Sequence, residues 1–240
     1  MLTAVRLDPK VIRIWADVYG MPESYVAVDV ETSGLDKDTD HILQLGWCKV
    51  RNKIAIENSG LVINCTENMS DIEKDIVEHR LMHTANKMAI KGAAYEWDIN
   101  KISKGESPKK ALDKFTSVCD SSNHLLSHYG TSFDYYMLDS FYLKYGNVRL
   151  PTLDEGQLLD SFILYKAAVC GIVPRDGESY SSIVNRVLYA KAPVSCSMKA
   201  CVSALNLTDE GVVTKRAHDA IYDAWLSHLV YESLRNIAES

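Results

Sequence analysis

The sequence predicts one α/β domain in which a central sheet is flanked by helices. Three observations favour this fold class. A short apolar and β-branched run begins at Tyr25, and another begins at His124. Residues 42–50 and 54–63 alternate on either side of a tight turn, which predicts an antiparallel meander with the first strand. Segments with a single apolar stripe predict helices between and after the strands.

The first predicted helix covers residues 8–19. Asp8 is placed to cap it, and Pro9 suits its first position. Its apolar residues form one stripe that we expect to dock on the main body: Val11, Ile14, Trp15 and Val18. Residues 1–23 are therefore expected to be an N-terminal helical extension packed on a single domain of residues 24–240.

The remaining elements follow from the same patterns. Strands are predicted at 25–30, 42–50, 54–63 and 124–127, with a fifth ending near 158–160. Helices are predicted at 70–96 and 108–119, from Ser132 onward, from 161 through Ala168, near 181–188, at 198–205 and from just after His218. Prolines and an Asp-Gly pair interrupt the chain beyond 170, which predicts an irregular helical insertion near 166–196.

The composition restricts the class of protein. Hydrophobic residues make up 47% and charged residues 24%, which is ordinary for a globular chain. No apolar run reaches the roughly 18 residues of a membrane span, and the N-terminus lacks a secretory apolar segment. We expect a cytoplasmic protein with no membrane partner. The 6 cysteines form no CxxC pair and predict core thiols. The net charge of −6 argues against a broad basic surface that coats nucleic acid.

Two acids stand at the end of the first predicted strand. Asp29 and Glu31 are two residues apart, so their side chains leave the same face within about 7 Å of each other. Two neighbouring carboxylates at the end of a buried strand repel one another unless a cation lies between them. A strand end whose acids point into solvent is the simpler alternative.

A third acid, Asp134, falls in the first turn of the helix that follows the strand at 124–127. Ser132 is the expected cap of that helix. The carboxylate is thereby placed at the mouth of the sheet. Taken alone, an acid at a helix N-terminus is explained by the helix dipole.

The last predicted helix carries a fourth acid, Asp223, five residues after His218. On a continuous helix these two side chains would point about 140° apart. They converge only if His218 lies on the loop before the helix, with Asp219 or its neighbour as the cap. That arrangement places a mobile imidazole beside a fixed carboxylate.

Three segments, in this order, resemble the three motifs of the DEDDh (DnaQ-like) 3′→5′ exonucleases. They are Val28-Asp-Val-Glu-Thr-Ser-Gly34, Gly130-Thr-Ser-Phe-Asp134 and His218-Asp-Ala-Ile-Tyr-Asp223, and the resemblance spans about residues 24–236. The tyrosine subclass would have Tyr where this chain has Asp219, so the histidine subclass is favoured. The second motif lacks the asparagine of many members and is closer to some phage-encoded exonucleases.

The resemblance implies a ribonuclease H-like fold: a mixed five-stranded sheet, made of a three-strand antiparallel meander plus parallel strands and flanked by helices. It also implies two divalent cations, Mg²⁺ or Mn²⁺, which suit all-oxygen ligands. The implied metal ligands are Asp29, Glu31, Asp134 and Asp223, with Asp29 between the two ions. His218 is implied as the general base, and contacts to the terminal nucleotide are implied for Thr32, Leu35 and Phe133.

The implied reaction is hydrolysis of terminal phosphodiesters at single-stranded or frayed DNA 3′ ends, which releases nucleoside 5′-monophosphates. Two alternatives stay open: an exoribonuclease that trims RNA 3′ ends or short oligoribonucleotides, and a non-catalytic subunit associated with a polymerase. The expected partner is a single-stranded nucleic acid 3′ end, with a polymerase or replication protein as a further candidate. A phage-encoded enzyme would act in the host cytoplasm.

Overall fold

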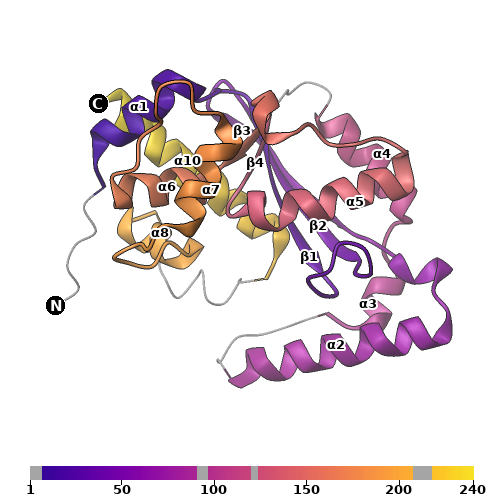
Figure 1. Ribbon diagram of the computed structural model, residues 1–240. Coiled ribbons are helices and arrows are strands. Elements are labelled where there is room, and N and C mark those ends of the chain that lie inside the picture. The colour runs from indigo at the N-terminus through magenta and orange to yellow at the C-terminus, as the bar shows by residue number, and fades with distance from the viewer. Residues whose placement is uncertain (1–6, 91–96, 120–123, 208–217) are drawn as a thin grey trace.

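A five-stranded mixed sheet forms the centre of the computed structural model, which describes residues 7–90, 97–119, 124–207 and 218–240. The strand order is β3-β2-β1-β4-β5. The strands are β1 (Tyr25–Thr32), β2 (Ile42–Arg51), β3 (Ile54–Val62), β4 (Leu125–Ser127) and β5 (Leu158–Asp160). The first three strands form an antiparallel meander, while β4 and β5 run parallel to β1. The predicted α/β fold class is confirmed (Figure 1).

Helices cover both faces of this sheet and extend beyond it. They are α1 (Pro9–Tyr19), α2 (Asp71–Ile90), α3 (Ile99–Ser103), α4 (Pro108–Cys119), α5 (Asp134–Gly146), α6 (Ser161–Cys170), α7 (Tyr180–Tyr189), α8 (Met198–Ala204) and α10 (Ala220–Glu239). Three short 3₁₀ helices are η1 (Cys65–Asn68), η2 (Gly130–Ser132) and η3 (Leu153–Glu155). Among the described residues no helix is both long and apolar enough to span a bilayer.

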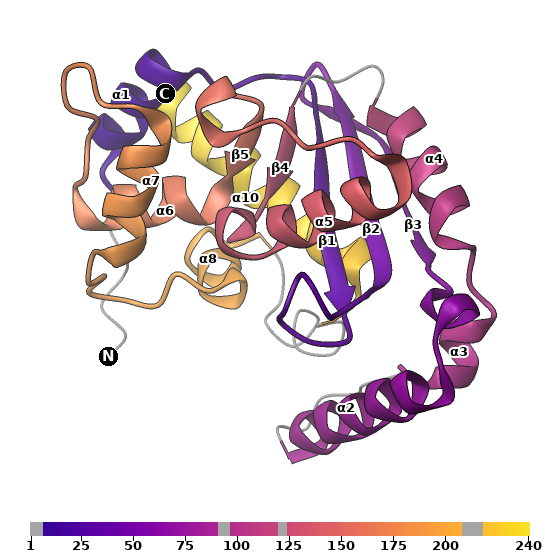
Figure 2. The ribbon, with the colours of Figure 1, turned by 45° about the vertical axis from the view of Figure 1, so that its right-hand side comes forward.

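The side chains of β1 alternate between two apolar cores. Tyr25 and Ala27 pack with α1, α6, α7, α8 and α10, whereas Val26 and Val28 pack with α4 and α5. Figure 2 shows α10 behind the sheet and α5 in front of it. Because Asp29 continues the series Tyr25 and Ala27 at period two, it points toward the α10 side of the sheet. The fold thereby directs the first-motif acids toward the last helix.

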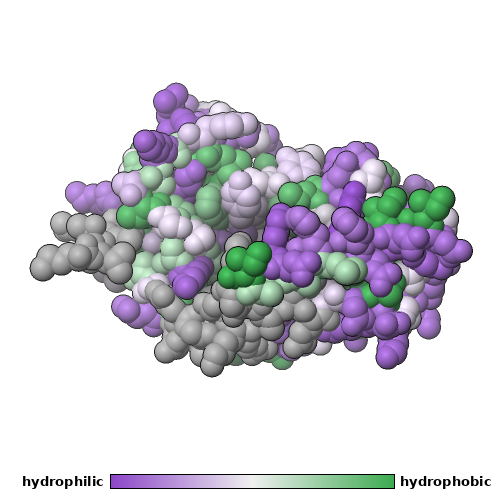
Figure 3. All heavy atoms as spheres, turned by 90° about the horizontal axis from the view of Figure 1, so that it is seen from below, coloured by the Kyte–Doolittle hydropathy of each residue, from purple (hydrophilic) through white to green (hydrophobic). Residues whose placement is uncertain are grey.

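A smaller apolar cluster attaches α2 and α3 to the start of β2. Its buried members are Leu43, Cys65, Met69, Val77, Leu81, Trp97 and Ile102. In Figures 1 and 2, α2 lies below the sheet and at the edge of the molecule. Figure 3 views this end from below, where hydrophilic residues predominate over the region of α2 and isolated hydrophobic groups lie among them. The outer surface of α2 includes the exposed side chains of Ile72 and Ile90.

The predicted α1 is present, but its buried face differs from the predicted stripe. Asp8 Oδ1 accepts a hydrogen bond from the Lys10 N–H at 3.0 Å, as expected for the cap. The buried residues are Val11, Ile12 and Trp15, whereas Ile14 and Val18 are exposed. The helix is therefore rotated so that Ile12 faces the body, against α6 and α10. The boundary between an extension and the main domain at residue 23 stays a prediction, as does the insertion near 166–196.

One helix assignment needs correction. The helix expected from Ser132 begins at Asp134, because residues 130–132 form the 3₁₀ turn η2 and Phe133 precedes the helix without a side-chain cap. The helix expected over 70–96 is present over Asp71–Ile90, and residues 91–96 lie outside the described residues. The five-residue helix α3 is too short to show an apolar period and was not expected.

Candidate metal centre

Three acids from distant parts of the chain meet at the end of β1. Asp29 and Glu31 come from β1, and Asp223 comes from the first turn of α10. One carboxylate oxygen of each residue lies within 4.8 Å of the others. In Figure 2 this end of β1 points downward, beside the start of α10. The arrangement brings together the acids expected from the first and third motifs.

Two glycines allow α10 to approach the sheet this closely. Gly46 of β2 pairs with Asp29 of β1 on one side and with Gly60 of β3 on the other. A Cβ atom on Gly46 would lie 2.2 Å from the backbone of Ala220, and one on Gly60 would lie 2.6 Å from Ile221 Cγ1. The start of α10 can therefore pack directly against the sheet because Gly46 and Gly60 have no side chains.

The first turn of α10 is held by polar contacts. Asp219 is the N-cap, and its Oδ1 accepts a hydrogen bond from the Ile221 N–H at 3.2 Å. Gln44 Oε1 accepts from the Ala220 N–H at 2.9 Å. His218 precedes the helix with a φ of 68°, in the left-handed region. The expected position of His218 on the loop, with Asp219 as the cap, is confirmed.

His218 lies beside the acids and remains open to solvent. Its Nδ1 is 3.7 Å from Glu31 Oε1, and its backbone N–H donates to Asp223 Oδ2 at 3.3 Å. The side chain of His218 is 45% exposed, against 14% for that of Glu31. The backbone of this residue is thus tied to one acid while its imidazole can reach a ligand in the site.

Asp134 occupies a separate, buried position next to Asp29. Its Oδ1 accepts from the Val30 N–H at 3.2 Å, and its Oδ2 accepts from the Ser127 hydroxyl at 2.8 Å. It does not belong to the group of acids whose oxygens lie within 4.8 Å of one another. Each of its oxygens already accepts one hydrogen bond from the protein. A direct bond to a cation would therefore use the second lone pair of one of these oxygens.

The electrostatics of the site favour a bound cation. Burial raises the pKa of Asp29 well above its usual range, and the charges of Asp134 and Asp223 raise it further. Burial and the charge of Glu31 raise the pKa of Asp223 to about 7. Burial also raises the pKa of Asp134 to about 7, against its two hydrogen bonds. Within the described part of the chain, no lysine or arginine forms an ion pair with these acids. A divalent cation would remove their mutual repulsion.

The three residues expected to contact substrate lie around this site in different environments. Leu35 is 84% exposed on the loop between β1 and β2. The Thr32 hydroxyl donates to the Gly34 carbonyl at 2.6 Å. Phe133 is partly buried against the core on the α5 side. Their roles in binding stay predictions.

The second-motif loop is held by an acid that the sequence analysis did not single out. Asp160, at the end of β5, accepts hydrogen bonds from the Tyr129 N–H at 2.9 Å and from the Thr131 N–H and hydroxyl at 3.0 and 2.7 Å. His128 lies 3.0 Å from the Ser161 hydroxyl, and its pKa is lowered to about 4 by burial. The loop that carries Asp134 is therefore fastened to β5 and to the start of α6.

Other supporting residues were also missed, although the sequence contains a signal for two of them. Gln44 and Gly46 interrupt an otherwise apolar strand, which marks a polar contact and a close backbone approach. Ser127, which holds Asp134, has no such signal because it ends a strand where serine is common.

Comparison with known proteins extends these observations. No protein-family model matches the sequence, and no curated protein matches it. Solved structures do match in fold. A zinc-bound complex of E. coli Exonuclease I with single-stranded DNA matches with a TM-score of 0.59 and 13% identity, over 89% of this chain and 40% of that chain. A complex of E. coli Exonuclease I with a dA16 oligonucleotide matches with a TM-score of 0.58 and 13% identity, over 91% and 42%.

A third similar structure is the RNase domain of the yeast Pop2 protein. Its TM-score is 0.53 at 12% identity, over 96% of this chain and 82% of that domain. The chain spans about two fifths of the Exonuclease I chains that it matches. These likenesses show that the protein has the ribonuclease H-like α/β fold that these nucleases share, with an acidic cluster that could hold a metal ion at the end of its first strand.

Proposed function

We propose that the protein is a metal-dependent 3′→5′ exonuclease of the DEDDh type that removes nucleotides from single-stranded or frayed DNA 3′ ends. The observation that carries this proposal is the meeting of Asp29, Glu31 and Asp223 within 4.8 Å, with His218 beside them. The structural similarity to nucleases supports the same reading.

The donor set suits two divalent cations such as Mg²⁺ or Mn²⁺. All its ligand atoms are carboxylate oxygens, which these hard cations prefer. Asp29, Glu31 and Asp223 would hold them, and Asp134 would support them next to Asp29. Cations held there would supply an activated water and would neutralise charge during displacement at a phosphate.

The residues of the chain then have distinct tasks. His218 accepts the proton of the attacking water on Nε2, while its Nδ1 faces Glu31 at 3.7 Å. The Asp223 carboxylate accepts the His218 backbone N–H, which keeps the imidazole over the acids. Leu35, exposed beside the site, packs against the terminal base and separates it from its neighbour.

The choice of DNA rests on the Exonuclease I structures, which hold single-stranded DNA. The similarity to the RNase domain of Pop2 supports the alternative, an exoribonuclease acting on RNA 3′ ends. A hydroxyl group on the ribose distinguishes the two substrates, and a residue that contacts it decides the preference.

An end-labelled time course tests this proposal. Single- and double-stranded DNA and RNA of one sequence are incubated with Mg²⁺, with Mn²⁺ or with a chelator, and products are separated by size. We expect stepwise shortening from the 3′ end, release of nucleoside 5′-monophosphates and no reaction with chelator. Products that shorten from the 5′ end, or no cleavage of any substrate by a protein that binds Mn²⁺, would contradict the proposal.

A further inference from the structure

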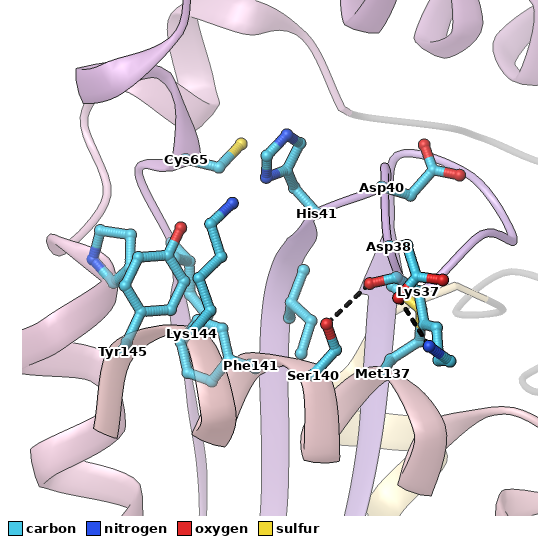
Figure 4. A pocket seen from close by; sticks show the side chains of 13 residues that line it. Lys37, Asp38, Asp40, His41, Cys65, Met137, Ser140, Phe141, Lys144 and Tyr145 are labelled. Carbon is cyan, nitrogen blue, oxygen red and sulfur yellow. Dashed lines mark hydrogen bonds and ion pairs between the residues drawn. The ribbon is translucent and has the colours of Figure 1, made fainter. Parts of the chain in front are cut away.

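A small hollow, open to solvent and with about 30 Å³ accessible to the centre of a water molecule, lies between α5 and the loop that joins β1 to β2. Ile42, Met137 and Phe141 provide apolar lining, and His41 and Lys144 provide polar groups. In Figure 4 the Lys144 ammonium extends from α5 toward the His41 imidazole. We refer to this hollow as the His41–Lys144 pocket.

The acids near this pocket already have partners of their own. Asp38 accepts a hydrogen bond from Lys37 Nζ at 2.6 Å. Asp40, which also lines the pocket, accepts one from the Ser33 hydroxyl at 2.9 Å and forms an ion pair with Arg80. Each of these carboxylates is therefore already paired with a cation, although the charges of Asp40 and Glu73 still act to raise the pKa of His41.

Lys144 and His41 face one another across the pocket, and the carboxylate of Glu73, which accepts hydrogen bonds from the Ser70 N–H and hydroxyl at 2.7 Å, interacts electrostatically with both. Among the described residues Lys144 forms no ion pair, and its ammonium lies 5.4 Å from the centre of the Tyr145 ring. Burial lowers the pKa of His41, and the charge of Lys144 lowers it further. An anion held between an ammonium and an imidazole N–H would remove this repulsion and accept hydrogen bonds from both groups.

The pocket lies beside the candidate metal centre. α5 begins at Asp134, next to the acids, and Lys144 follows ten residues later, about 15 Å along the helix axis. On the opposite wall, His41 precedes Ile42, which pairs with Thr32 at the end of β1. A stacked strand advances about 3.4 Å per nucleotide, so 15 Å corresponds to about four nucleotides, and fewer if the strand is stretched.

We propose that the His41–Lys144 pocket binds a backbone phosphate of the substrate strand, about two to four nucleotides upstream of the 3′ end. This inference rests on the proposed exonuclease function and adds the path of the strand to it. The apolar lining would contact the sugar or base next to that phosphate. Free phosphate and a released mononucleotide carry the same chemical group, so the test has to separate these sources.

The test compares substrates of two lengths. The kinetic parameters kcat and KM are measured in Mg²⁺ for a dinucleotide and for an octanucleotide. The dinucleotide is too short to reach the pocket, whereas the octanucleotide reaches it. Lys144→Gln should raise the KM for the octanucleotide about fivefold to tenfold, with kcat unchanged. It should leave the dinucleotide unaffected. Lys144→Arg should retain most of the affinity, because it keeps the positive charge.

The salt dependence gives an independent readout. Each phosphate contact with a single strand contributes about 0.7 to the slope of log KM against log salt. Lys144→Gln should therefore lower that slope by about 0.7 for the octanucleotide only. Lys10→Gln, on the exposed surface of α1, is the matched control and should change neither KM nor the slope.

The outcomes separate this inference from the proposed function. Cleavage of both lengths by the wild type, with an equal effect of Lys144→Gln on both, overturns the pocket and leaves the nuclease intact. No cleavage of either length contradicts the nuclease itself. Magnetic resonance of the His41 ring, assigned with His41→Gln, identifies the ligand. A shift with the octanucleotide supports the proposal, whereas a shift with a nucleoside monophosphate alone assigns the pocket to product and overturns it.

Discussion

α10 meets β1 at two polar contacts, and they differ in how their charges are balanced. At the contact near the end of α10, side chains of the protein itself balance the charge of the acid. Tyr25 Oη donates to Glu232 Oε1 at 2.6 Å and lies 2.8 Å from His228 Nδ1. Arg235 donates to both oxygens of Glu232 at 3.0 Å. The partly buried Glu232 at this end has its positive partner, Arg235, on the same helix.

The contact near the start of α10 has acids on both sides. The charge of Asp223 on α10 raises the pKa of Asp29 on β1, and the charge of Glu31 on β1 raises the pKa of Asp223. No lysine or arginine of the described chain forms an ion pair with these acids. The same strand and helix therefore carry one balanced contact that stabilises the fold and one unbalanced contact that opposes it until a cation binds. The unbalanced contact is where we place the chemistry.

Asp29→Asn should have the largest effect, because it removes the central acid of the unbalanced contact. We expect kcat to fall about 10³-fold or more, since cation binding supplies several kcal/mol to the transition state. In chelator the same variant should unfold about 3 °C higher than the wild type, because relief of repulsion adds about 1 kcal/mol. Thermal unfolding with and without Mg²⁺ measures this, with Asp71→Asn on exposed α2 as the control. A lower Tm of the variant in chelator would show that the acids do not repel one another in the folded protein.

His218→Asn should reduce kcat by about 10²–10³-fold, as expected for loss of a general base. Asparagine tolerates the left-handed backbone that His218 adopts, so the loop geometry is retained. We expect the Tm to stay within about 1 °C because the side chain is partly exposed. Single-turnover rates at saturating Mg²⁺ measure the loss, and His79→Asn serves as the control. An unchanged rate would remove His218 from proton transfer.

Gly46→Ala tests whether the gap in the sheet is needed to bring the acids together. The added Cβ would overlap the backbone of Ala220, so α10 must shift away from β2. We expect a loss of about 2 kcal/mol in the free energy of unfolding and a marked loss of activity. Denaturant unfolding and Mn²⁺ affinity measure the two effects. Arg51→Ala, at the exposed end of β2, should change neither.

His228 probes the balanced contact through its pH dependence. Burial lowers its pKa to about 4, below the value of about 6.5 in the unfolded chain. Between these two pKa values the unfolded chain binds a proton at His228 that the folded chain does not bind. The free energy of unfolding therefore decreases as the pH falls through 6.5 toward 4. Relative to His228→Gln, the wild type should lose about 2 kcal/mol between pH 7 and pH 5. Urea unfolding of both proteins at the two pH values measures this difference, and an equal loss in both would exclude the effect.

Tyr25→Phe should have the smallest effect, and this effect should be on stability and not on activity. The change removes the hydroxyl between His228 and Glu232 and costs about 1 kcal/mol. Activity measured well below the Tm should be unchanged, because the contact lies at the other end of α10. A loss of turnover comparable to that of Asp29→Asn would show that the two contacts are not separate.

The features that could be predicted are those that local chemistry determines. Period-two alternation along β1 places Asp29 and Glu31 on one face, and the helical repeat requires His218 to precede α10. Both follow from spacing alone. Ser132 was expected as a cap from its residue type, but a 3₁₀ turn occupies residues 130–132 and Asp134 itself begins the helix.

The features that escaped prediction depend on contacts between distant segments. The pairing of Gly46 with the backbone of Ala220 joins residues whose separation in the chain carries no pattern. The same holds for His41 and Lys144, which come from a loop and from the end of a helix. The α1 face was misassigned because Ile12 and Ile14 are equally apolar, and only the partner surface on α6 and α10 selects between them.

The position of the third acid in the chain has a consequence for synthesis. Asp29 and Glu31 emerge from the ribosome long before Asp223, and α10 also supplies buried residues such as Leu226 and Val230 to the core. A nascent chain that has not yet released α10 has neither the complete acid cluster nor the surface on which β1 packs. The acid cluster and the apolar core on this side of the sheet are therefore completed only after translation of α10.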